Sequence, residues 1–459
     1  MQRMKRFATL LALICLSCFA ANPAIAQSIL RDAETEALLT DMARPLFVAA
    51  GLSPGSTRIV LVNDPSINAF VAGGQIVYIH TGLLDAADTA NEVQGVLAHE
   101  IGHIIGGHAV FQNDGGYGTI SILSLLLGAA AMAAGSPEAG TGILMMGQRA
   151  AIGKYLAFSR AQESSADAAG ARYLKGAGIT GQGMLSFFNK LTAQMHRYGY
   201  YTTNPELDPF ALTHPLSADR VENLKADLQR DPSWGKPSDP AIEGRFKRVQ
   251  AKLRGFVNEP KVTLRRYPPG DQSVSAHYAR AYAYHKSGYP EQAAAETTAL
   301  VKIAPEDPYF LELEGQILLE SGKPRDALVP LREATRRSQN QPLIAATFGH
   351  ALIATDDKAN LAEAEVILRQ AVARDRDNPF AWMQLGTVYE RKGDEPRTAL
   401  ATAERAHLTG DKRVALMSAR AAMSGLAQGS SDWIRAQDIM MVAQTALEEE
   451  KRKKKRISG

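Results

Sequence analysis

Cysteine is nearly absent from this chain of 459 residues. The two cysteines, Cys15 and Cys18, both lie within the first 26 residues, so residues 27–459 contain no thiol. That absence excludes a disulfide framework, and a fold built from these residues must be stabilised by a large apolar core. The 433 residues that follow residue 26 are enough for two or three domains.

An excess of charge of one sign is also lacking. Three of the 51 cationic residues lie before residue 27, and six form the run 451–456. Residues 27–450 therefore carry 42 cations against 48 acidic residues, a balance that argues against a nucleic-acid-binding surface. We predict that residues 451–459 form a basic tail. The simplest interpretation is a solvated helix end, and contact with anionic lipid or an acidic partner is the alternative.

Residues 1–26 have the pattern of an export signal. Cationic residues precede an apolar run over residues 7–20, and Ala24 and Ala26 occupy the two positions that a signal peptidase reads. This run of 14 residues is too short to span a bilayer comfortably. We therefore predict cleavage after Ala26, with an uncleaved anchor as the alternative.

Helical and extended patterns alternate over the next 200 or so residues. Strands are predicted over 58–63 and 75–80, with a third strand and a Gly-Gly turn between them. Helices are predicted over residues 28–50, 91–108, 141–175 and 181–197, and again after Pro215. Residues 232–240 and 265–273 are rich in turn-forming residues and are predicted as loops.

The chain after residue 275 has an internal repeat. Small residues recur at Ala293, Ala327, Ala364 and Ala399, in steps of 34, 37 and 35 residues. These steps match the repeat of about 34 residues in tetratricopeptide arrays, where a small residue lies at the crossing of two helices. We predict an all-α tetratricopeptide-repeat solenoid over residues 275–450, with the last pair of helices as a cap.

The stretch AHEIGHIIGGHAV, from residue 98, carries the strongest chemical signal. His99 and His103 stand four residues apart on a predicted helix, so both imidazoles leave the same face and can share one ion. Glu100 is placed to reach a water molecule at that ion and to act as a general base. The pattern predicts one Zn²⁺ and a hydrolytic reaction.

A third histidine in this stretch does not complete a metzincin motif. That motif requires a histidine at position 109, which is Ala109, and His108 is rotated by about 100° from the required direction. The third ligand must come from elsewhere, and ESSAD (163–167) is the best candidate. Its Glu163 can ligate the metal, and Asp167 can accept the free N–H of a ligand histidine.

Several motifs together resemble a known family. NAFVAGGQIVYIHTGLL, VLAHEIGH, ESSAD and THPLSADR occur in the same order as in zinc metallopeptidases of the HtpX/CAAX-prenyl-protease type, over roughly residues 35–230. The resemblance implies an α+β gluzincin-like metallopeptidase domain, which we place at residues 27–264 and follow with a linker at 265–274. By position it supports His99, His103 and Glu163 as ligands and Glu100 as the base, with Asp167, His214 and Arg220 at the site.

His214 has three possible roles at this stage. It can fill the open metal position and shut the enzyme, donate a hydrogen bond to the oxyanion, or only cap the helix that follows Pro215. Arg220 can orient this loop or stabilise developing negative charge. We also expect substrate to pair, as an added strand, with the strand predicted over residues 75–80.

Residues 118–134 form the longest apolar run outside the export signal. A single transmembrane span here would separate His103 from Glu163, which a shared metal forbids. We therefore predict a buried or lid-forming helical segment, with peripheral membrane contact as the alternative.

The export signal, the metallopeptidase motifs and the repeats together resemble periplasmic members of the family. This implies a periplasmic zinc endopeptidase in quality control and assembly of outer-membrane proteins. The repeats would dock misfolded or stalled outer-membrane proteins or the β-barrel assembly machinery. The alternative is an assembly chaperone or scaffold in which proteolysis is secondary. A nucleic-acid partner is not expected.

Overall fold

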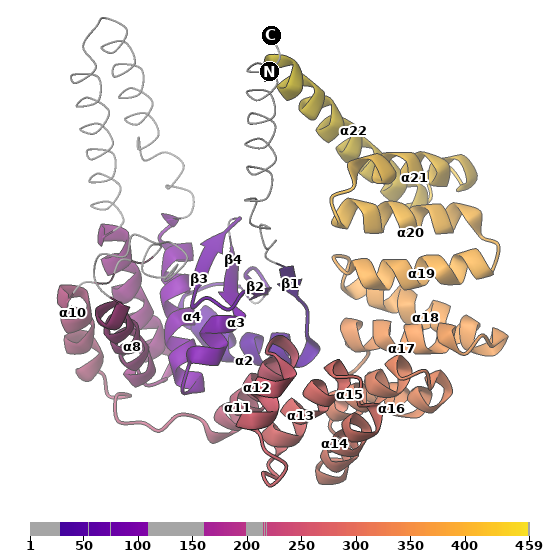
Figure 1. Cartoon of the computed structure of the whole chain (residues 1–459). Helices are drawn as coiled ribbons and strands as arrows, with labels where there is room; N and C mark the ends of the chain where they lie inside the picture. The colour runs from indigo at the N-terminus through magenta and orange to yellow at the C-terminus, as the bar shows by residue number, and fades with distance from the viewer. Residues whose placement is uncertain are drawn as a thin grey trace, which may run out of the picture.

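The computed structural model of the chain contains a mixed α and β part followed by a long stack of helices (Figure 1). It describes residues 28–53, 55–73, 75–108, 160–198, 214, 216 and 218–457. The predictions for the export signal at residues 1–26 and for the apolar run at residues 118–134 lie outside the described residues. Within the described residues, we find no helix with the length and apolar character needed to cross a membrane.

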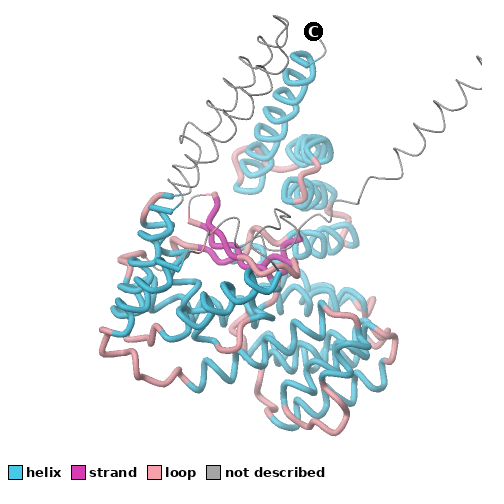
Figure 2. The backbone as a smooth tube through the Cα atoms, turned by 60° about the vertical axis from the view of Figure 1, so that its left-hand side comes forward, coloured by secondary structure: helices cyan, strands magenta, loops and turns pink. Residues whose placement is uncertain are grey.

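A four-stranded sheet forms the centre of the first part (Figure 2). Its strands, in the spatial order β1-β2-β4-β3, are β1 (Ser28–Leu30), β2 (Arg58–Asn63), β4 (Ile76–His80) and β3 (Ala69–Ala72). The pair β2–β4 is parallel, and the pairs β1–β2 and β3–β4 are antiparallel. The three strands predicted from the alternating pattern are confirmed.

The helix predicted over residues 28–50 is wrong at its start. Residues 28–30 form β1 on the edge of the sheet, and the helix α2 (Ala33–Ala49) begins only after Asp32. The Asp32 side chain accepts a hydrogen bond from the Thr35 backbone N–H at 2.7 Å, which is the usual cap of a helix N-terminus. Hydrogen bonds to β2 make residues 28–30 extended, and such long-range pairing is not visible in helical periodicity.

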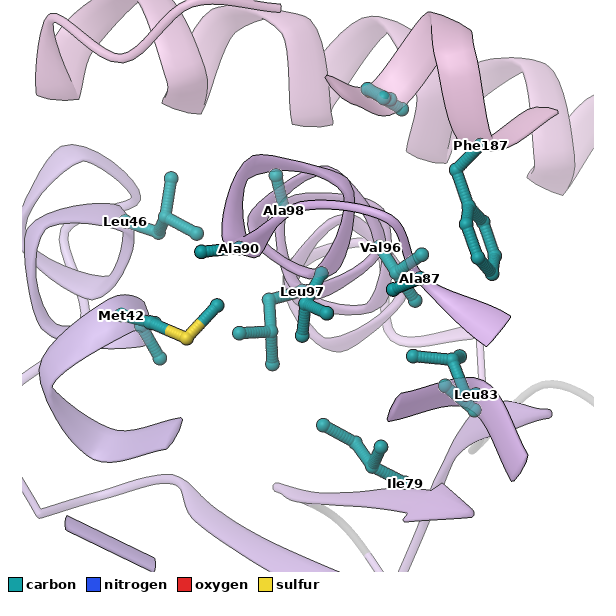
Figure 3. Close-up of a cluster of buried hydrophobic side chains, with 14 of the residues drawn as sticks. Met42, Leu46, Ile79, Leu83, Ala87, Ala90, Val96, Leu97, Ala98 and Phe187 are labelled. Atoms are coloured by element: carbon teal, nitrogen blue, oxygen red, sulfur yellow. The ribbon is translucent and has the colours of Figure 1, made fainter. Parts of the chain in front are cut away.

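Helices cover one face of this sheet. Val77 and Ile79 on β4 are fully buried against the helices, whereas Tyr78 faces the opposite side and stacks on Phe70 of β3 at 5.0 Å. Figure 3 shows Leu97 pointing from a neighbouring helix toward the space between Met42 and Ile79. The helices involved are α2, α3 (Thr81–Ala86), α4 (Ala90–Ile105), α8 (Gln182–Tyr198), α10 (Ala218–Gln229) and a helix that includes residues 160–177.

Helix α4 is the central helix of the apolar core, and glycines allow other helices to approach it closely. A Cβ atom at Gly102 would lie 2.7 Å from the Ala166 carbonyl oxygen, and one at Gly95 would lie 2.5 Å from the Met184 Cα. Only glycine permits such backbone contact. Because Gly102 and Ala166 touch, the helix of residues 160–177 lies directly beside the histidines of α4.

Helix α11 (Pro240–Val257) and the short α12 (Pro260–Arg266) connect the two parts of the chain (Figure 1). Helix α11 packs against α2, α3 and α4 on one side and against α13 (Val274–Lys286), the first helix of the stack, on the other. The predicted linker at residues 265–274 is held by the buried Arg280, whose guanidinium donates to the Pro268 and Asp271 carbonyl oxygens. The two parts therefore share α11.

The rest of the chain is largely helical, and each helix packs on the next. The helices after α13 are α14 (Pro290–Ile303), α15 (Pro308–Glu320), α16 (Pro324–Arg337), α17 (Pro342–Ala354), α18 (Lys358–Arg374), α19 (Pro379–Arg391), α20 (Glu395–Leu408), α21 (Lys412–Gly425) and α22 (Ser431–Ile457). Helix α22 continues through Ile457, so the basic run predicted as a tail from residue 451 begins within a helix.

Three of the four predicted small residues are fully buried where paired helices cross. Ala293, Ala327 and Ala364 have no exposed surface, whereas Ala399 is only partly buried. At the crossing of α19 and α20, Gly386 faces Ala401. Ala399 packs instead beside the buried cluster of Leu400, Ala422 and Ala436, so it differs from the other three alanines in being only partly buried.

Residues 30–34 lie between the two parts of the molecule. Ala33 packs in an apolar cluster with Leu311 and Ile344, and Arg31 pairs with Asp375 at 2.9 Å. Glu34 is buried and accepts from the Tyr278 hydroxyl at 2.6 Å. The start of α2 is thus held by helices that lie more than 200 residues further along the chain.

Candidate metal centre and active site

The site is built on the last two turns of α4. The Thr89 side chain caps this helix by accepting from the Glu92 backbone N–H, and the helix runs unbroken through His103. His99 and His103 leave the same face, and their Nε2 atoms lie 3.1 Å apart. Both imidazoles and the Glu100 carboxylate are buried, so a polar cluster lies under the protein surface.

Two further side chains meet these histidines. Glu163, from the helix of residues 160–177, lies with its oxygens 3.2 Å from His103 Nε2 and 3.4 Å from His99 Nε2. His214 Nδ1 lies 3.1 Å from a Glu163 oxygen and 3.3 Å from His99 Nε2. All four residues are buried, and one donor atom from each lies within 4.8 Å of the others.

The donor atoms lie close enough to share one bound metal ion. Zinc bound at about 2.0–2.1 Å from each ligand requires its donor atoms to lie about 3.3 Å apart. The donor pairs given above lie 3.1–3.4 Å apart. In addition, both Glu100 carboxylate oxygens are buried without a hydrogen-bond partner among the described residues, which is costly unless a cation or water satisfies them. The residue set therefore fits a divalent metal.

Neighbouring side chains orient two of the imidazoles. Asp167 Oδ1 lies 2.9 Å from His99 Nδ1. His108 Nδ1 lies 2.8 Å from His103 Nδ1, so the Nδ1 atoms of His99 and His103 each lie beside a polar atom while their Nε2 atoms are directed at the cluster. Such contacts select the imidazole tautomer whose Nε2 lone pair is free to ligate. His108 is not part of the group of donor atoms that could share one ion.

Arg220 lies behind the carboxylates. Its guanidinium forms two hydrogen bonds with Asp167, at 2.7 and 2.9 Å, and an ion pair with Glu163 at 3.1 Å. These contacts hold both acidic residues in place, and paired, parallel hydrogen bonds of this kind are geometrically specific. These contacts with Asp167 and Glu163 suit the orienting role proposed for Arg220.

The electrostatics of the cluster favour one positive charge at its centre. Burial opposes protonation of His99, but Asp167 and Glu163 outweigh it and raise the pKa of His99 to about 10. Burial likewise opposes ionisation of Glu163, but hydrogen bonds with His103 and His214 hold the pKa of Glu163 far below its usual range. Burial and the neighbouring His99 lower the pKa of His103. A bound cation would supply the charge that the two carboxylates require.

His214 also contacts the edge strand of the sheet. Its Nε2 lies 3.1 Å from the Ala69 carbonyl oxygen on β3. The sequence offered no signal for this contact, because Ala69 contributes only a backbone atom. His214 therefore lies in the donor cluster with its Nδ1 and contacts a backbone acceptor at the edge of the sheet with its Nε2.

The prediction that substrate pairs with the strand at residues 75–80 is wrong. That strand, β4, lies between β2 and β3 and has a hydrogen-bonded neighbour on each side. Among the described strands, the edge on the side of the site is β3, which is paired only with β4. Sequence alternation identified the strands correctly but could not give their order in the sheet.

Known proteins resemble both the first part and the whole chain. A family described as peptidase family M48 matches residues 30–228. The beta-barrel assembly-enhancing protease of Escherichia coli is 25% identical over 371 residues, covering 78% of this chain and 73% of that protein. The protein of the same name from Yersinia pestis is 26% identical over 385 residues, covering 81% and 76%.

Other matches cover less of the chain. The metalloprotease LoiP of Escherichia coli is 27% identical over 196 residues, covering 42% of this chain and 70% of that protein. Among solved structures, the crystal structure of MamA matches 38% of this chain and 96% of its own, with 21% identity and a TM-score of 0.28. The matched family and the named proteases agree with the buried cluster on α4.

Proposed function

We propose that this chain is a zinc-dependent endopeptidase of peptidase family M48 with a gluzincin-type ligand set, a proposal supported by the family match over residues 30–228 and by the names of the similar proteases. The ligands are His99, His103 and Glu163. The observation that supports this most is that buried donor atoms of His99, His103, Glu163 and His214 all lie within 4.8 Å of one another.

Glu100 is the proton-transfer residue in this proposal. Zinc bound in the cluster supplies positive charge that polarises the scissile carbonyl and acidifies water. Glu100 adjoins His99 in sequence, is fully buried, and has two carboxylate oxygens without hydrogen-bond partners among the described residues. Such a carboxylate can take a proton from the attacking water and pass it to the leaving amine.

His214 restrains the enzyme in the described state. Its Nδ1 stands at the fourth donor position of the cluster, and its Nε2 lies against the Ala69 carbonyl. We propose that substrate must displace His214 before a water molecule and the scissile bond can enter. Arg220 and Asp167 remain in place during this change, because they hold Glu163 and His99 from the other side.

Substrate is proposed to bind as an added strand along β3. Departure of His214 frees the Ala69 carbonyl to accept a hydrogen bond from a substrate backbone N–H. Recognition through backbone groups tolerates varied side chains, which suits a protease that acts on unfolded chains. Cleavage sites that fall mainly within stable helices of folded substrates would contradict this mode of binding.

In the cell, we propose that the protein acts in the periplasm in quality control and assembly of outer-membrane proteins. The names of the similar Escherichia coli and Yersinia pestis proteins support this role. We interpret the helix pairs after residue 275 as tetratricopeptide repeats that dock misfolded substrate or the β-barrel assembly machinery. The second candidate, a chaperone or scaffold, is favoured by the length of this helical stack.

The substitution Glu100→Gln tests the proposal and separates the two candidates. It preserves side-chain shape, so zinc content should remain at one per chain while hydrolysis of an unfolded protein falls by about a thousandfold or more. Metal analysis and a protease assay on purified protein measure both quantities. If Glu100→Gln fully restores outer-membrane assembly in a deletion strain, the scaffold function is the main one.

A further inference from the structure

A second site lies where the two parts of the molecule meet. The start of α2, helix α11 and helices α13, α15 and α17 line a cavity of about 320 Å³, together with residues 378–380 at the start of α19. This volume is at the lower end of the range of about 300–1,000 Å³ for ligand pockets. The cavity contains none of the residues of the metal centre.

The walls of this interdomain cavity combine aromatic side chains with a few polar groups. Phe256, Tyr282, Tyr309 and Phe380 contribute rings, and Phe256 and Phe380 are 39% and 38% exposed at the surface. Such rings bury the apolar stem of a ligand and attract a cation over their faces. A cavity of this kind differs from a packing defect, which would be lined by apolar groups alone.

One polar side chain in the wall, Asn378, has a hydrogen-bond partner for its oxygen but none for its nitrogen among the described residues. Asn378 is 3% exposed, and its Oδ1 caps α19 by accepting from the Ala381 backbone N–H at 3.0 Å. Its Nδ2 is buried without a hydrogen-bond partner among the described residues. A buried N–H group left unsatisfied is costly, so Asn378 is suited to donate to a carbonyl oxygen of a ligand.

The cationic side chains that line the cavity are in ion pairs, whereas one of its carboxyl groups is not. Arg31 is paired with Glu36 and Asp375, and Lys252 is paired with Asp32 and Glu34. Glu312 on α15 has no ion pair or hydrogen bond among the described residues, and burial raises its pKa to about 8. Lys252 acts on Glu312 electrostatically and opposes this rise in pKa, but it is paired with Asp32 and Glu34, so among the described residues no cation is in ion-pair contact with Glu312.

We propose that the interdomain cavity binds a lysine or arginine side chain of an extended polypeptide segment. The cationic group lies at Glu312, the aliphatic stem lies among the aromatic rings, and a backbone carbonyl of the same segment accepts from Asn378 Nδ2. Of the following helices, α19 carries the exposed Met383 and α21 the exposed Met417, 39% and 71% exposed.

Because the walls come from both parts of the molecule, an occupant contacts the protease and the repeats together. Residues 30–33 line the cavity and join the end of β1 to the start of α2 in the protease part. The site is thus distinct from the edge of β3, and a bound polypeptide could contact both places at different points along its length.

Fluorescence anisotropy with three matched peptides tests this site. The probes are acetylated and amidated nonapeptides of glycine and serine with a central Leu-Lys-Leu, an otherwise identical norleucine peptide and a glutamate peptide, each with an uncharged fluorophore. The protein is the full chain from residue 27 with Glu100→Gln, which prevents cleavage. We expect the lysine peptide to bind at least about tenfold more tightly than the norleucine peptide, as a charge-assisted contact provides.

Substitutions in the cavity test whether the preference for the lysine peptide arises there. Glu312→Gln should remove it, whereas Glu314→Gln, two residues along α15 and outside the cavity lining, should leave it intact. Asn378→Ser keeps a helix-capping side chain and should lower the affinities for the lysine and norleucine peptides by the same factor. Equal affinities in the unsubstituted cavity, tightest binding of the glutamate peptide, undetectable binding of the lysine peptide, or a preference that survives Glu312→Gln would each overturn the proposal.

Discussion

Two buried clusters of charge in this molecule differ in how their charges are satisfied. At the metal centre, imidazole nitrogens and Glu163 converge on one point, and Glu100 has no hydrogen-bond partner among the described residues. The second, the interface cluster, consists of Asp32, Glu34, Arg248, Lys252 and Tyr278. There each carboxylate is paired with a cation, and Glu34 also accepts from a hydroxyl.

This difference separates a functional site from a structural one. The charges of the interface cluster are paired among its own members, so removing a charged member weakens buried pairs and is expected to lower stability. The metal centre is complete only with an added cation, so its members are expected to determine metal content and activity. The predictions below test this contrast, starting with the largest effect.

Replacing one buried glutamate with alanine in each cluster gives the sharpest test of this contrast. Glu163→Ala should reduce zinc to background and abolish hydrolysis, because the third ligand is lost. Glu34→Ala should leave zinc at one per chain in the folded protein while lowering its stability. Metal analysis after gel filtration measures both variants. Undiminished zinc in Glu163→Ala would overturn Glu163 as a ligand.

Removal of the cation from the interface cluster should mainly affect stability. Lys252 is 5% exposed in its side chain and lies between Asp32 and Glu34. We expect Lys252→Met to lower the free energy of unfolding by about 3–5 kcal/mol, since breaking a buried pair leaves an uncompensated charge. Urea unfolding measures this, with the exposed Lys225→Met as a control that should change it by less than about 0.5 kcal/mol. A loss of zinc in folded Lys252→Met would break the contrast between the clusters.

His214→Ala should alter activity without altering stability to a comparable extent. With the restraint removed, we expect basal hydrolysis of an unfolded protein and self-cleavage to rise several-fold, and zinc content to remain. The surface substitution His407→Ala serves as a control. Lower turnover with full zinc would instead assign His214 to oxyanion stabilisation, and unchanged activity would leave only the helix-capping role.

The smallest expected effect concerns Glu312, a carboxyl group that neither cluster contains. Burial raises its pKa from 4.5 to about 8, so ionisation destabilises the folded state progressively as the pH rises between these values. Glu312→Gln should therefore leave the Tm unchanged at pH 4 and raise it by a few degrees at pH 8.5. Thermal unfolding at both pH values, beside the exposed Glu222→Gln, measures the difference. An equal shift at pH 4 would exclude ionisation as its cause.

The sequence predicted the parts of the site that local geometry determines. His99, Glu100 and His103 lie on one helix, where a spacing of four residues sets the direction of the side chains whatever surrounds them. The same holds for the three strands with alternating apolar residues and for the helices after residue 275, which the structure confirms. That His108 does not fit the metzincin motif also followed from the rotation of about 100° per residue along a helix.

Only the tertiary structure decided which distant groups meet. Contact of Gly102 with Ala166 brings Glu163 to the histidines, and packing of residue 214 against β3 brings its imidazole to the Ala69 carbonyl. Strand order made β3 rather than β4 the available edge, and pairing with β2 turned residues 28–30 from a predicted helix into a strand. These outcomes depend on long-range packing and backbone hydrogen bonds, which leave no periodic trace in the sequence.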